Sequence, residues 1–307
     1  MSSNLAIVIP AYKDVFLSQT LDSLCNQSCK DFTLYIGDDC SPYDIKSIVD
    51  QYNEKLNVKY HRFNNNLGGT DLVAHWERCI DLTDKEEWLW LFSDDDIIGS
   101  KCVELFYKYQ KKYSFDVYHF DIKEINELGI ETGITSNYMD VTTSFYLHKK
   151  KMQGKLISMV VENIFSRAIY NQCGGFQHFD LAWGSDTATW IKFIYQKGLK
   201  KIPGDYIYWR KSSQNITPSL DVNIVDRKVN SLMKYIEWTY SFFINVSPIQ
   251  LFWVNSYGYL LRIRRFVCYA SKSVIDNSIS QFVRIHKVKL LKPVFKVLIP
   301  IIARKNK

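Results

Sequence analysis

Residues 88–96 read WLWLFSDDD, an apolar run that leads directly into three consecutive carboxylates. A short apolar run of this kind is typical of a β-strand that is buried on both faces. Strands buried in this way occur in parallel sheets, because helices cover both sides of such sheets. The stretch therefore predicts a central strand whose carboxyl end carries a cluster of negative charge.

The chain on both sides of this stretch alternates between strand-like and helix-like segments. Short apolar runs predict further strands at 5–10 and 32–37, and another strand is expected at 58–63. Amphipathic segments predict helices at 14–27, 44–54, 71–80 and 101–112. This alternation predicts an α/β fold with a Rossmann-like, mostly parallel central sheet and helices on both of its faces. In such sheets, ligands bind at the carboxyl ends of the strands.

The second half of the chain is less regular. It predicts a strand at 115–123, then a loop rich in Gly, Thr and Ser, and later a helix at 186–197. Farther on the pattern becomes helical, since apolar residues recur at helical spacing from Val229 to Ile236. We therefore expect a catalytic domain at 1–226 and a helical C-terminal region at 227–307.

The composition excludes several classes of protein. Of the 307 residues, 47% are hydrophobic and 23% are charged, which is typical of a globular protein rather than a disordered one. No stretch approaches the roughly 20 apolar residues that cross a bilayer, and the first residues do not form a signal peptide. The seven cysteines include no C-x-x-C pair. A reduced, cytoplasmic protein without structural zinc is therefore expected.

Charge is unevenly distributed along the chain. Residues 227–307 contain 15 of the 39 Lys and Arg residues but only two of the 32 Asp and Glu residues. At 288–307, Lys alternates with Leu, Val, Ile and Phe, which suits the interface of an anionic membrane. We expect this basic region to hold the protein peripherally on the inner face of the cytoplasmic membrane. The alternative is that these helices only pack against the catalytic domain. Nothing in the first 226 residues indicates a nucleic-acid partner.

Two acidic clusters each follow a predicted strand. Asp38 and Asp39 come after the second strand of the chain, and Asp94–Asp96 come after the fourth. Adjacent carboxylates repel one another unless a cation compensates them. Carboxylate oxygens suit Mg²⁺ or Mn²⁺, which leave coordination positions for phosphate oxygens. One cluster alone would be explained by a solvated turn or a helix N-cap, whereas two clusters at one sheet edge favour a metal and phosphate site.

Several motifs occur in one order along residues 4–215. They are IVIPAYK at 7–13, IGDDCSP at 36–42, NLGG at 66–69, FSDDD at 92–96, GGF at 174–176, WGSD at 183–186 and WR at 209–210. In order and spacing they resemble a family 2 glycosyltransferase with the GT-A fold, of the non-processive type that builds bacterial surface polysaccharides. The resemblance implies a nucleotide-sugar donor, a divalent metal ion (Mn²⁺ or Mg²⁺) and an inverting transfer.

The resemblance also implies which residues bind the nucleotide. The residues that it places around the base and ribose are Pro10, Tyr12, Asp38, Asp39, Asn66, Gly68 and Gly69. Among them, Asp39 would accept a hydrogen bond from the base. The metal ligand would be Asp95 or Asp96, and Asp94 or Asp95 would contact the ribose. Ser93 stands where the family usually has the first acid, so the division of roles within the acidic run stays open.

Catalytic and acceptor residues follow from the same resemblance. Asp186 matches the catalytic base, although Ser185 precedes it where the family often has Glu. Trp183, Arg210 and Lys211 would contact the acceptor or the diphosphate. For Arg210 and Lys211, surface cations near a strand end are the alternative. The donor is expected to be a UDP-sugar, and the acceptor a saccharide or a lipid-linked saccharide.

Two other classes of protein stay as alternatives. A sugar-phosphate nucleotidyltransferase would carry a Gly-rich loop with Arg and Lys after its first strand, where Pro-Ala-Tyr stands at 10–12. A nicotinamide-dependent enzyme would need G-x-G-x-x-G there. A carbohydrate-binding or scaffold protein with a decayed site is the non-catalytic alternative. Hydrolysis of a nucleotide-sugar in the presence of Mn²⁺ would distinguish a working transferase from it.

Overall fold

The structure is a computed structural model that describes residues 4–212 and 219–304. The chain packs into two compact units. The first consists of Met1–Ser144, Ile157–Gln177 and Thr189–Ser212, and the second of Phe145–Leu156, His178–Ala188 and Ser213–Lys307.

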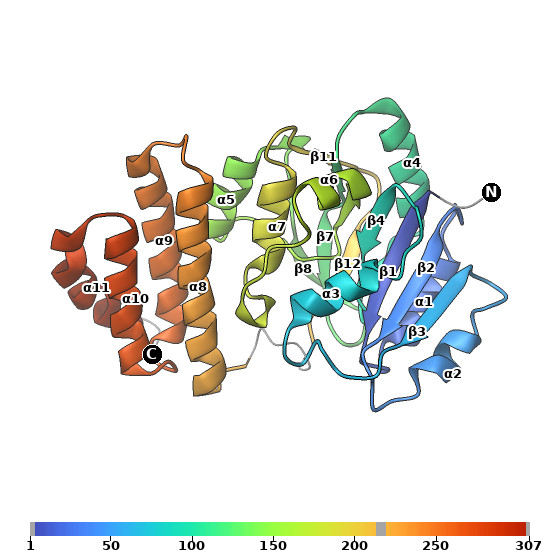
Figure 1. The fold of residues 1–307 in the computed structure, drawn as a ribbon, viewed down its shortest axis with the longest axis horizontal. Coiled ribbons are helices and arrows are strands. Elements are labelled where there is room, and N and C mark those ends of the chain that lie inside the picture. Colours follow the sequence, from blue (N-terminus) through green and yellow to red (C-terminus); the bar gives the residue numbers. More distant parts are fainter. Residues whose placement is uncertain (1–3, 213–218, 305–307) are drawn as a thin grey trace. The chain divides into compact units, whose positions relative to one another are not determined.

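The first unit is built on an eight-stranded sheet (Figure 1). Its order is β3 (Val58–Arg62), β2 (Thr33–Asp38), β1 (Leu5–Ala11), β4 (Trp88–Leu91), β10 (Asn163–Ser166), β6 (Val117–His119), β11 (Leu199–Lys201) and β9 (Val141–Thr142). The first four strands are parallel to one another, whereas β10 is antiparallel to both of its neighbours. The mostly parallel sheet expected from the sequence is therefore confirmed.

Helices cover both faces of this sheet. Leu5, Ile7 and Ile9 of β1 face a core that also contains apolar side chains of α1 (Leu17–Cys25), α2 (Ile45–Asp50) and α4 (Cys102–Lys112). Ala6 and Val8 point to the other face and are also fully buried. There α3 (Leu72–Ile80) packs against β1, β2 and β4, and α6 (Arg167–Gln172) packs against β10. Burial on both faces explains why these strands are continuous apolar runs.

A second, four-stranded sheet has the order β5 (Ile97–Ile98), β12 (Ile207–Arg210), β7 (Ile122–Ile125) and β8 (Glu131–Thr135). The single strand predicted at 115–123 is wrong, because the chain leaves the large sheet after His119 and enters the small sheet at Ile122. Asp121 stabilises this break, since its carboxylate accepts hydrogen bonds from the backbone N–H of Tyr138 and from Ser136.

The segment that was expected to be a loop contains regular structure. It includes the β7–β8 hairpin, β9 and α5 (Ser144–Met152). Every residue of β8 is exposed, so this strand lacks the alternation of apolar and polar residues that identifies a half-buried strand. The helix predicted at 186–197 is α7 (Ser185–Phe193), which begins in the second unit and ends in the first.

The second unit is helical. Besides α5 and the short η1 (Asp180–Ala182), it contains α8 (Val222–Phe242), α9 (Pro248–Phe266), α10 (Lys272–Ile285), η2 (Lys289–Leu291) and α11 (Lys292–Arg304). Helix α8 packs against α9 and α10, and α11 packs against the same two helices. The boundary predicted after Asp226 falls inside α8, and the second unit also takes in 145–156 and 178–188. Of the helices in 4–212 and 219–304, none is long and apolar enough to cross a bilayer.

Candidate active site

The loop after β1 and the acidic run after β4 meet at one edge of the sheet, because β1 and β4 are parallel neighbours. The backbone N–H groups of Tyr12 and Lys13 donate to Asp94 Oδ2 at 2.8 and 2.7 Å. Burial raises the pKa of Asp94 to about 6, and the Lys13 ammonium opposes this shift. One carboxylate oxygen of Asp94 thus holds the loop that follows β1.

Asp96 faces the protein interior. Its Oδ1 accepts a hydrogen bond from the backbone N–H of Arg210 at 2.7 Å, and its Oδ2 accepts one from Ser93 Oγ at 2.6 Å. Burial and the neighbouring Asp95 raise the pKa of Asp96 well above its usual range. Asp96 therefore ties the acidic run to β12 of the smaller sheet.

Asp95 is the third member of the run, and its carboxylate forms an ion pair with the ammonium of Lys13. Lys13 also lies 3.8 Å from Asp94 Oδ1. Burial lowers the pKa of Lys13 and the adjacent carboxylates raise it, with a net upward shift. Sequence reasoning did not single out Lys13, because a lysine after a strand carries no signal of its partner.

Arg210 is fully buried in the interior. Its Nε donates to the carbonyl of Asp95 at 2.8 Å, and its Nη2 donates to Gln19 Oε1 at 2.7 Å. Its Nη1 donates to the carbonyls of Asn126 and Glu127, both at 3.1 Å. These bonds hold the acidic run, and a diphosphate contact by Arg210 would have to break them. The roles predicted for Arg210 and for the exposed Lys211 stay predictions.

Asp38 ends β2 and is fully buried. Its Oδ2 accepts hydrogen bonds from Tyr60 Oη and Arg62 Nη1, both on β3, and its Oδ1 accepts one from the backbone N–H of Ser41 at 2.8 Å. Tyr60 and Arg62 lie two residues apart on one strand, so both side chains point to the same face. Asp38 therefore links β2 to β3 and to the loop that follows β2.

Asp39 is the centre of a second network. Its two oxygens accept hydrogen bonds from the backbone N–H groups of Leu67 (2.8 Å) and Gly68 (2.9 Å). It also pairs with the guanidinium of Arg78 on α3. A Cβ on Gly68 would lie 2.7 Å from Asp39 Oδ2, so this turn requires glycine. The structure thus joins the 66–69 turn to Asp39, and the predicted roles of both at the base and ribose stay predictions.

Arg78 was missed by sequence reasoning, as was His75 one turn before it. Burial lowers the pKa of His75 to about 4, so the ring is neutral near pH 7 and Nδ1 accepts a hydrogen bond from Arg78 Nε at 3.0 Å. The guanidinium also lies over the ring of Phe63, 3.9 Å from its centroid. The contacts of His75 and Arg78 join α3 to the end of β2. No pattern in the local sequence indicates such long-range contacts.

The predicted nucleotide and metal residues therefore come together. Pro10 pairs in register with Gly37, which places the end of β1 beside the end of β2. Tyr12 follows and is 39% exposed. One edge of the first unit thus carries Pro10, Tyr12, Asp38, Asp39, Asn66, Gly68, Gly69, Asp94, Asp95 and Asp96.

Trp183 and Asp186 belong to the second unit. The turn before α7 is unusual, because Leu181 and Ala182 have φ angles of 57° and 52°. Non-glycine residues rarely adopt such angles, and they do so mainly at functional sites. The Lys228 ammonium lies 5.0 Å from the ring centroid of Trp183, and Asp186 Oδ1 accepts a hydrogen bond from the backbone N–H of Thr187 at 2.6 Å.

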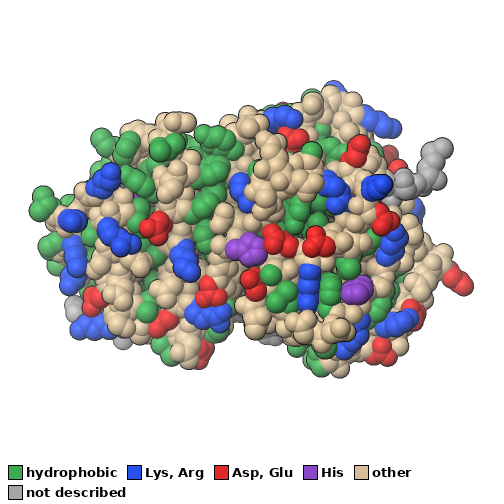
Figure 2. All heavy atoms as spheres, in the orientation of Figure 1, with side chains coloured by type: hydrophobic (Ala, Val, Ile, Leu, Met, Phe, Trp, Pro, Cys, Tyr) green, Lys and Arg blue, Asp and Glu red, His purple; other side chains and the backbone are tan. Residues whose placement is uncertain are grey.

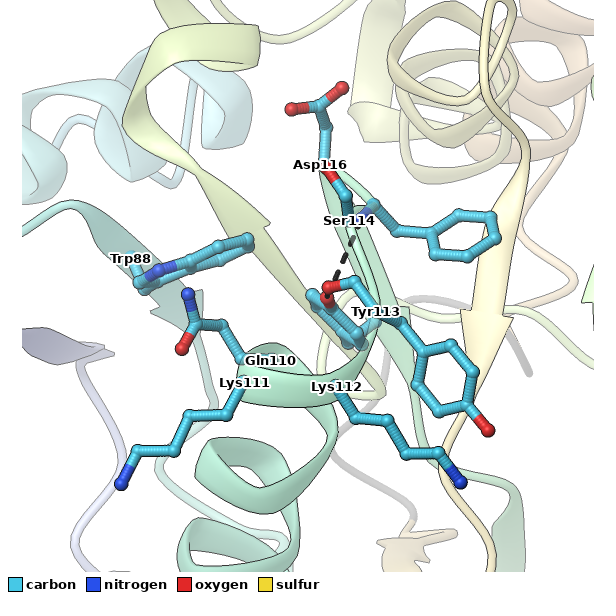
Figure 3. A pocket seen from close by; sticks show the side chains of 9 residues that line it. Trp88, Gln110, Lys111, Lys112, Tyr113, Ser114 and Asp116 are labelled. Atoms are coloured by element: carbon cyan, nitrogen blue, oxygen red, sulfur yellow. Dashed lines mark hydrogen bonds between the residues drawn. The ribbon is translucent and has the colours of Figure 1, made fainter.

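A separate pocket lies at the opposite end of the strands (Figure 3). Its lining includes Trp88, the first residue of β4, together with Lys111, Lys112 and Tyr113 at the end of α4. The acidic run follows the last residue of β4, so this pocket is not part of the candidate site.

A comparison with protein families identifies the family of the chain that carries this site. The model of glycosyl transferase family 2 matches residues 6–172, more than half of the chain. This chain belongs to glycosyl transferase family 2. The matched part contains both acidic clusters, the loop after β1 and the 66–69 turn.

Two relatives of this family 2 chain are similar over shorter stretches. An uncharacterized glycosyltransferase, MG060 of Mycoplasma genitalium, is 30% identical over 124 residues, which are 38% of this chain and 40% of that protein. The poly(ribitol-phosphate) β-N-acetylglucosaminyltransferase TarS of Staphylococcus aureus is 27% identical over 129 residues, which are 41% of this chain and 22% of TarS. The matches thus span less than half the length of either relative.

Solved structures resemble the whole chain. TarS residues 1–349 in complex with UDP match with a TM-score of 0.62 and 14% identity, over 98% of this chain and 88% of that one. The same part of TarS with UDP-GlcNAc matches with a TM-score of 0.60 and 13% identity over the same shares. At this identity the likeness establishes the fold, which is GT-A with C-terminal helices as expected.

The acidic run fits a divalent metal ion of the kind that the resemblance implies, through one carboxylate. Within 4–212 and 219–304, no group of three or more His, Cys, Asp or Glu side chains is arranged to hold a metal by itself. Asp94 and Asp96 hold backbone N–H groups, whereas the Asp95 carboxylate pairs with the end of the flexible Lys13 side chain. Mg²⁺ is often bound by one or two carboxylates together with substrate phosphates. Asp95 fits that pattern better than Asp96.

Proposed function

We propose that this protein transfers a sugar, with inversion, from a UDP-sugar to a hydroxyl group of a saccharide or lipid-linked saccharide. The observation that carries the proposal is the meeting of two carboxylate clusters and a glycine turn at one sheet edge in a chain of this family. The similar TarS structures are complexes with UDP and with UDP-GlcNAc, which supports a uridine nucleotide here as well.

The base and ribose would bind between the loop after β1 and the 66–69 turn. Tyr12 offers an exposed ring for stacking on the base. Asp39 already accepts hydrogen bonds from the turn, so a base that donates a further hydrogen bond to it would join a preformed network. Asp94 would contact the ribose with Oδ1, since Oδ2 is used by the loop.

Asp95 would hold the metal ion, with diphosphate oxygens completing its coordination. A bound Mn²⁺ or Mg²⁺ would stabilise the negative charge that develops on the departing diphosphate. Lys211, whose side chain is 66% exposed, would add a further positive charge. Arg210 and Asp96 would keep the acidic run in place for this contact.

Asp186 would act as the general base that takes the proton of the acceptor hydroxyl. Its position in the first turn of α7 holds its backbone rigidly, and Thr187 N–H orients its carboxylate. Trp183 would provide an aromatic surface for the acceptor sugar. The ammonium of Lys228 and the ring of Phe266 fix the orientation of Trp183.

The C-terminal helices would bind the surface of the cytoplasmic membrane. We define the apolar face as the exposed residues Leu290, Val294, Val297, Leu298 and Ile301. Four of these lie on α11 at helical spacing, and Lys289, Lys292 and Lys296 are interspersed with them. Residues 277–307 contain no acidic side chain. Figure 2 shows hydrophobic and basic side chains together over the C-terminal helices. This composition complements an anionic lipid surface.

A panel of nucleotides tests the catalytic proposal. UDP and a UDP-sugar with Mn²⁺ should raise the melting temperature, because a ligand at 100 times its Kd stabilises the folded state by about 2.7 kcal/mol. The same UDP-sugar should be slowly hydrolysed. Stabilisation by GDP or CDP alone would overturn the assignment of the base. Binding without hydrolysis or transfer to any saccharide would favour a non-catalytic protein.

A further inference from the structure

The ammonium of Lys13 contacts two carboxylates of the acidic run. It pairs with Asp95 Oδ2 and lies 3.8 Å from Asp94 Oδ1. The three side chains are mostly buried, with exposed fractions of 24%, 9% and 7% for Lys13, Asp95 and Asp94. The backbone of Lys13 is fixed as well, because its N–H donates to Asp94. Only the end of the side chain is free to move.

Neither Arg210 nor Asp96 takes the place of Lys13 beside the carboxylate of Asp95. The guanidinium of Arg210 donates to the carbonyl of Asp95 and not to its carboxylate. The carboxylate of Asp96 is turned toward Ser93 and the backbone of Arg210. Asp95 Oδ2 is therefore occupied by the Lys13 ammonium, and a metal ion can coordinate this oxygen only when the ammonium leaves it.

We propose that Lys13 occupies the metal position at Asp95 until a nucleoside diphosphate arrives, and that its ammonium then pairs with the diphosphate. This inference rests on the proposed function and adds the order in which the site is filled. Without a diphosphate, a metal ion at Asp95 would displace the largely buried ammonium from its closest partner and place a second positive charge beside it, which is costly. The diphosphate supplies new acceptors for the ammonium. Lys13 thus couples the binding of the metal ion to the binding of the diphosphate, and each ligand raises the affinity for the other.

The test measures Mn²⁺ binding by electron paramagnetic resonance, with and without UDP, in the full chain. Wild type should bind Mn²⁺ weakly alone and much more tightly with UDP. Lys13→Gln should bind Mn²⁺ without UDP about tenfold more tightly than wild type, a change typical of coupled sites. The same variant should bind UDP more weakly in EDTA, because the diphosphate has lost its ammonium partner.

Two further variants serve as controls. Lys13→Arg keeps the positive charge and should behave like wild type in Mn²⁺ binding without UDP. Lys46→Gln removes an exposed lysine that pairs with Asp50 at 2.6 Å on the surface of the same unit, and it should change neither affinity. If Lys13→Gln does not fold, Lys13→Met keeps the length of the side chain without its charge and replaces it in both titrations.

The outcomes separate this inference from the function on which it rests. If wild type binds UDP and Mn²⁺, but Lys13→Gln has the wild-type affinity for Mn²⁺ without UDP, the inference is overturned and the proposed function stands. Unchanged UDP binding by Lys13→Gln in EDTA overturns the transfer of the ammonium to the diphosphate. If wild type binds no nucleoside diphosphate with or without metal, both proposals fail.

Discussion

Asp95 and Asp96 are adjacent in the chain, yet their carboxylates have different surroundings. Asp96 is bonded to Ser93 and to the backbone of Arg210, whereas Asp95 is paired with a lysine side chain. The difference arises at a bend formed by Asp94 and Asp95 between β4 and β5, where neighbouring carboxylates meet different partners. One carboxylate is directed into the interior and its neighbour toward the edge of the sheet.

These surroundings predict different effects of substitution. Asp95→Asn should lower sugar transfer on the order of 100-fold or more, because the metal supplies several kcal/mol of charge stabilisation. Its urea midpoint should remain close to that of wild type. Asp96→Ala should lower the free energy of unfolding by about 2 kcal/mol or more, since a buried N–H and a hydroxyl lose their acceptor. Loss of Mn²⁺ binding in Asp96→Asn with unchanged stability would move the metal ligand to Asp96.

Asp186 is predicted to act on the acceptor and not on the donor. Asp186→Asn should reduce kcat by about 10²- to 10⁴-fold, the usual contribution of a positioned base. The affinity for UDP, measured by calorimetry, should stay near that of wild type. Ser185→Ala is the matched control, because it alters the preceding residue without removing a carboxylate. A collapse of nucleotide binding with a normal rate at saturation would make Asp186 a binding residue.

Helices α5, α8, α9 and α10 are joined by a buried chain of polar side chains. His148 Nδ1 lies 3.0 Å from Tyr235 Oη, and His148 Nε2 lies 3.0 Å from Asn255 Oδ1. Asn255 Nδ2 lies 3.3 Å from His286 Nε2. Burial lowers the pKa of His148 to about 3 and that of His286 to about 4. Both rings are therefore neutral in the folded protein near pH 7.

This network predicts that acid destabilises the helical unit. Below its usual pKa of about 6.5, each histidine is protonated in the unfolded chain but not in the folded one, so stability falls as the pH falls. Between pH 6.5 and 4, each ring should remove about 1.4 kcal/mol per pH unit. His148→Gln should flatten the dependence of the melting temperature on pH, whereas the exposed His61→Gln should not. An unchanged slope in His148→Gln would rule out His148 as the cause.

The proposed membrane binding belongs to the scale of the whole molecule, because it would depend on the 15 Lys and Arg residues, against two acidic ones, at 227–307. Phe295 and Ile299 of α11 are buried against the other helices, so the alternative of simple packing holds for the inner side of α11. Its outer side carries the apolar face. A truncation before α11 would expose the partners of Phe295, and substitutions on the apolar face are therefore the sharper test.

The double substitution Val294→Ser with Val297→Ser should leave the melting temperature unchanged and reduce co-sedimentation with anionic liposomes. Lys292→Glu with Lys296→Glu should also reduce it, since each basic residue near an anionic surface contributes about 1 kcal/mol. Binding of the wild type should weaken with salt. Lys46→Gln is the control for the loss of a positive charge elsewhere. Unchanged sedimentation of both double variants would exclude α11 as the membrane contact.

Local sequence patterns predicted the first four strands of the large sheet. β1, β2 and β4 lie within one or two residues of the runs that predicted them, because burial on both faces demands continuous apolar residues. The edge strand β3 also lies where it was predicted, although most of its residues are partly or fully exposed. Local patterns did not predict β10, which enters the sheet antiparallel between β4 and β6. Nor did they predict β8, whose exposed residues have no apolar face.

The sequence by itself determined that carboxylates end two buried strands, because strand period and residue order are local properties. Only the tertiary structure decided which groups those carboxylates meet. Arg78 reaches Asp39 across 39 positions of sequence, Lys13 reaches Asp95 across 82, and the backbone of Arg210 reaches Asp96 across 114. Such pairs depend on how parallel strands and their helices are brought together in the fold. Consequently the sequence located the edge that carries the site, and packing assigned a separate task to each acid on it.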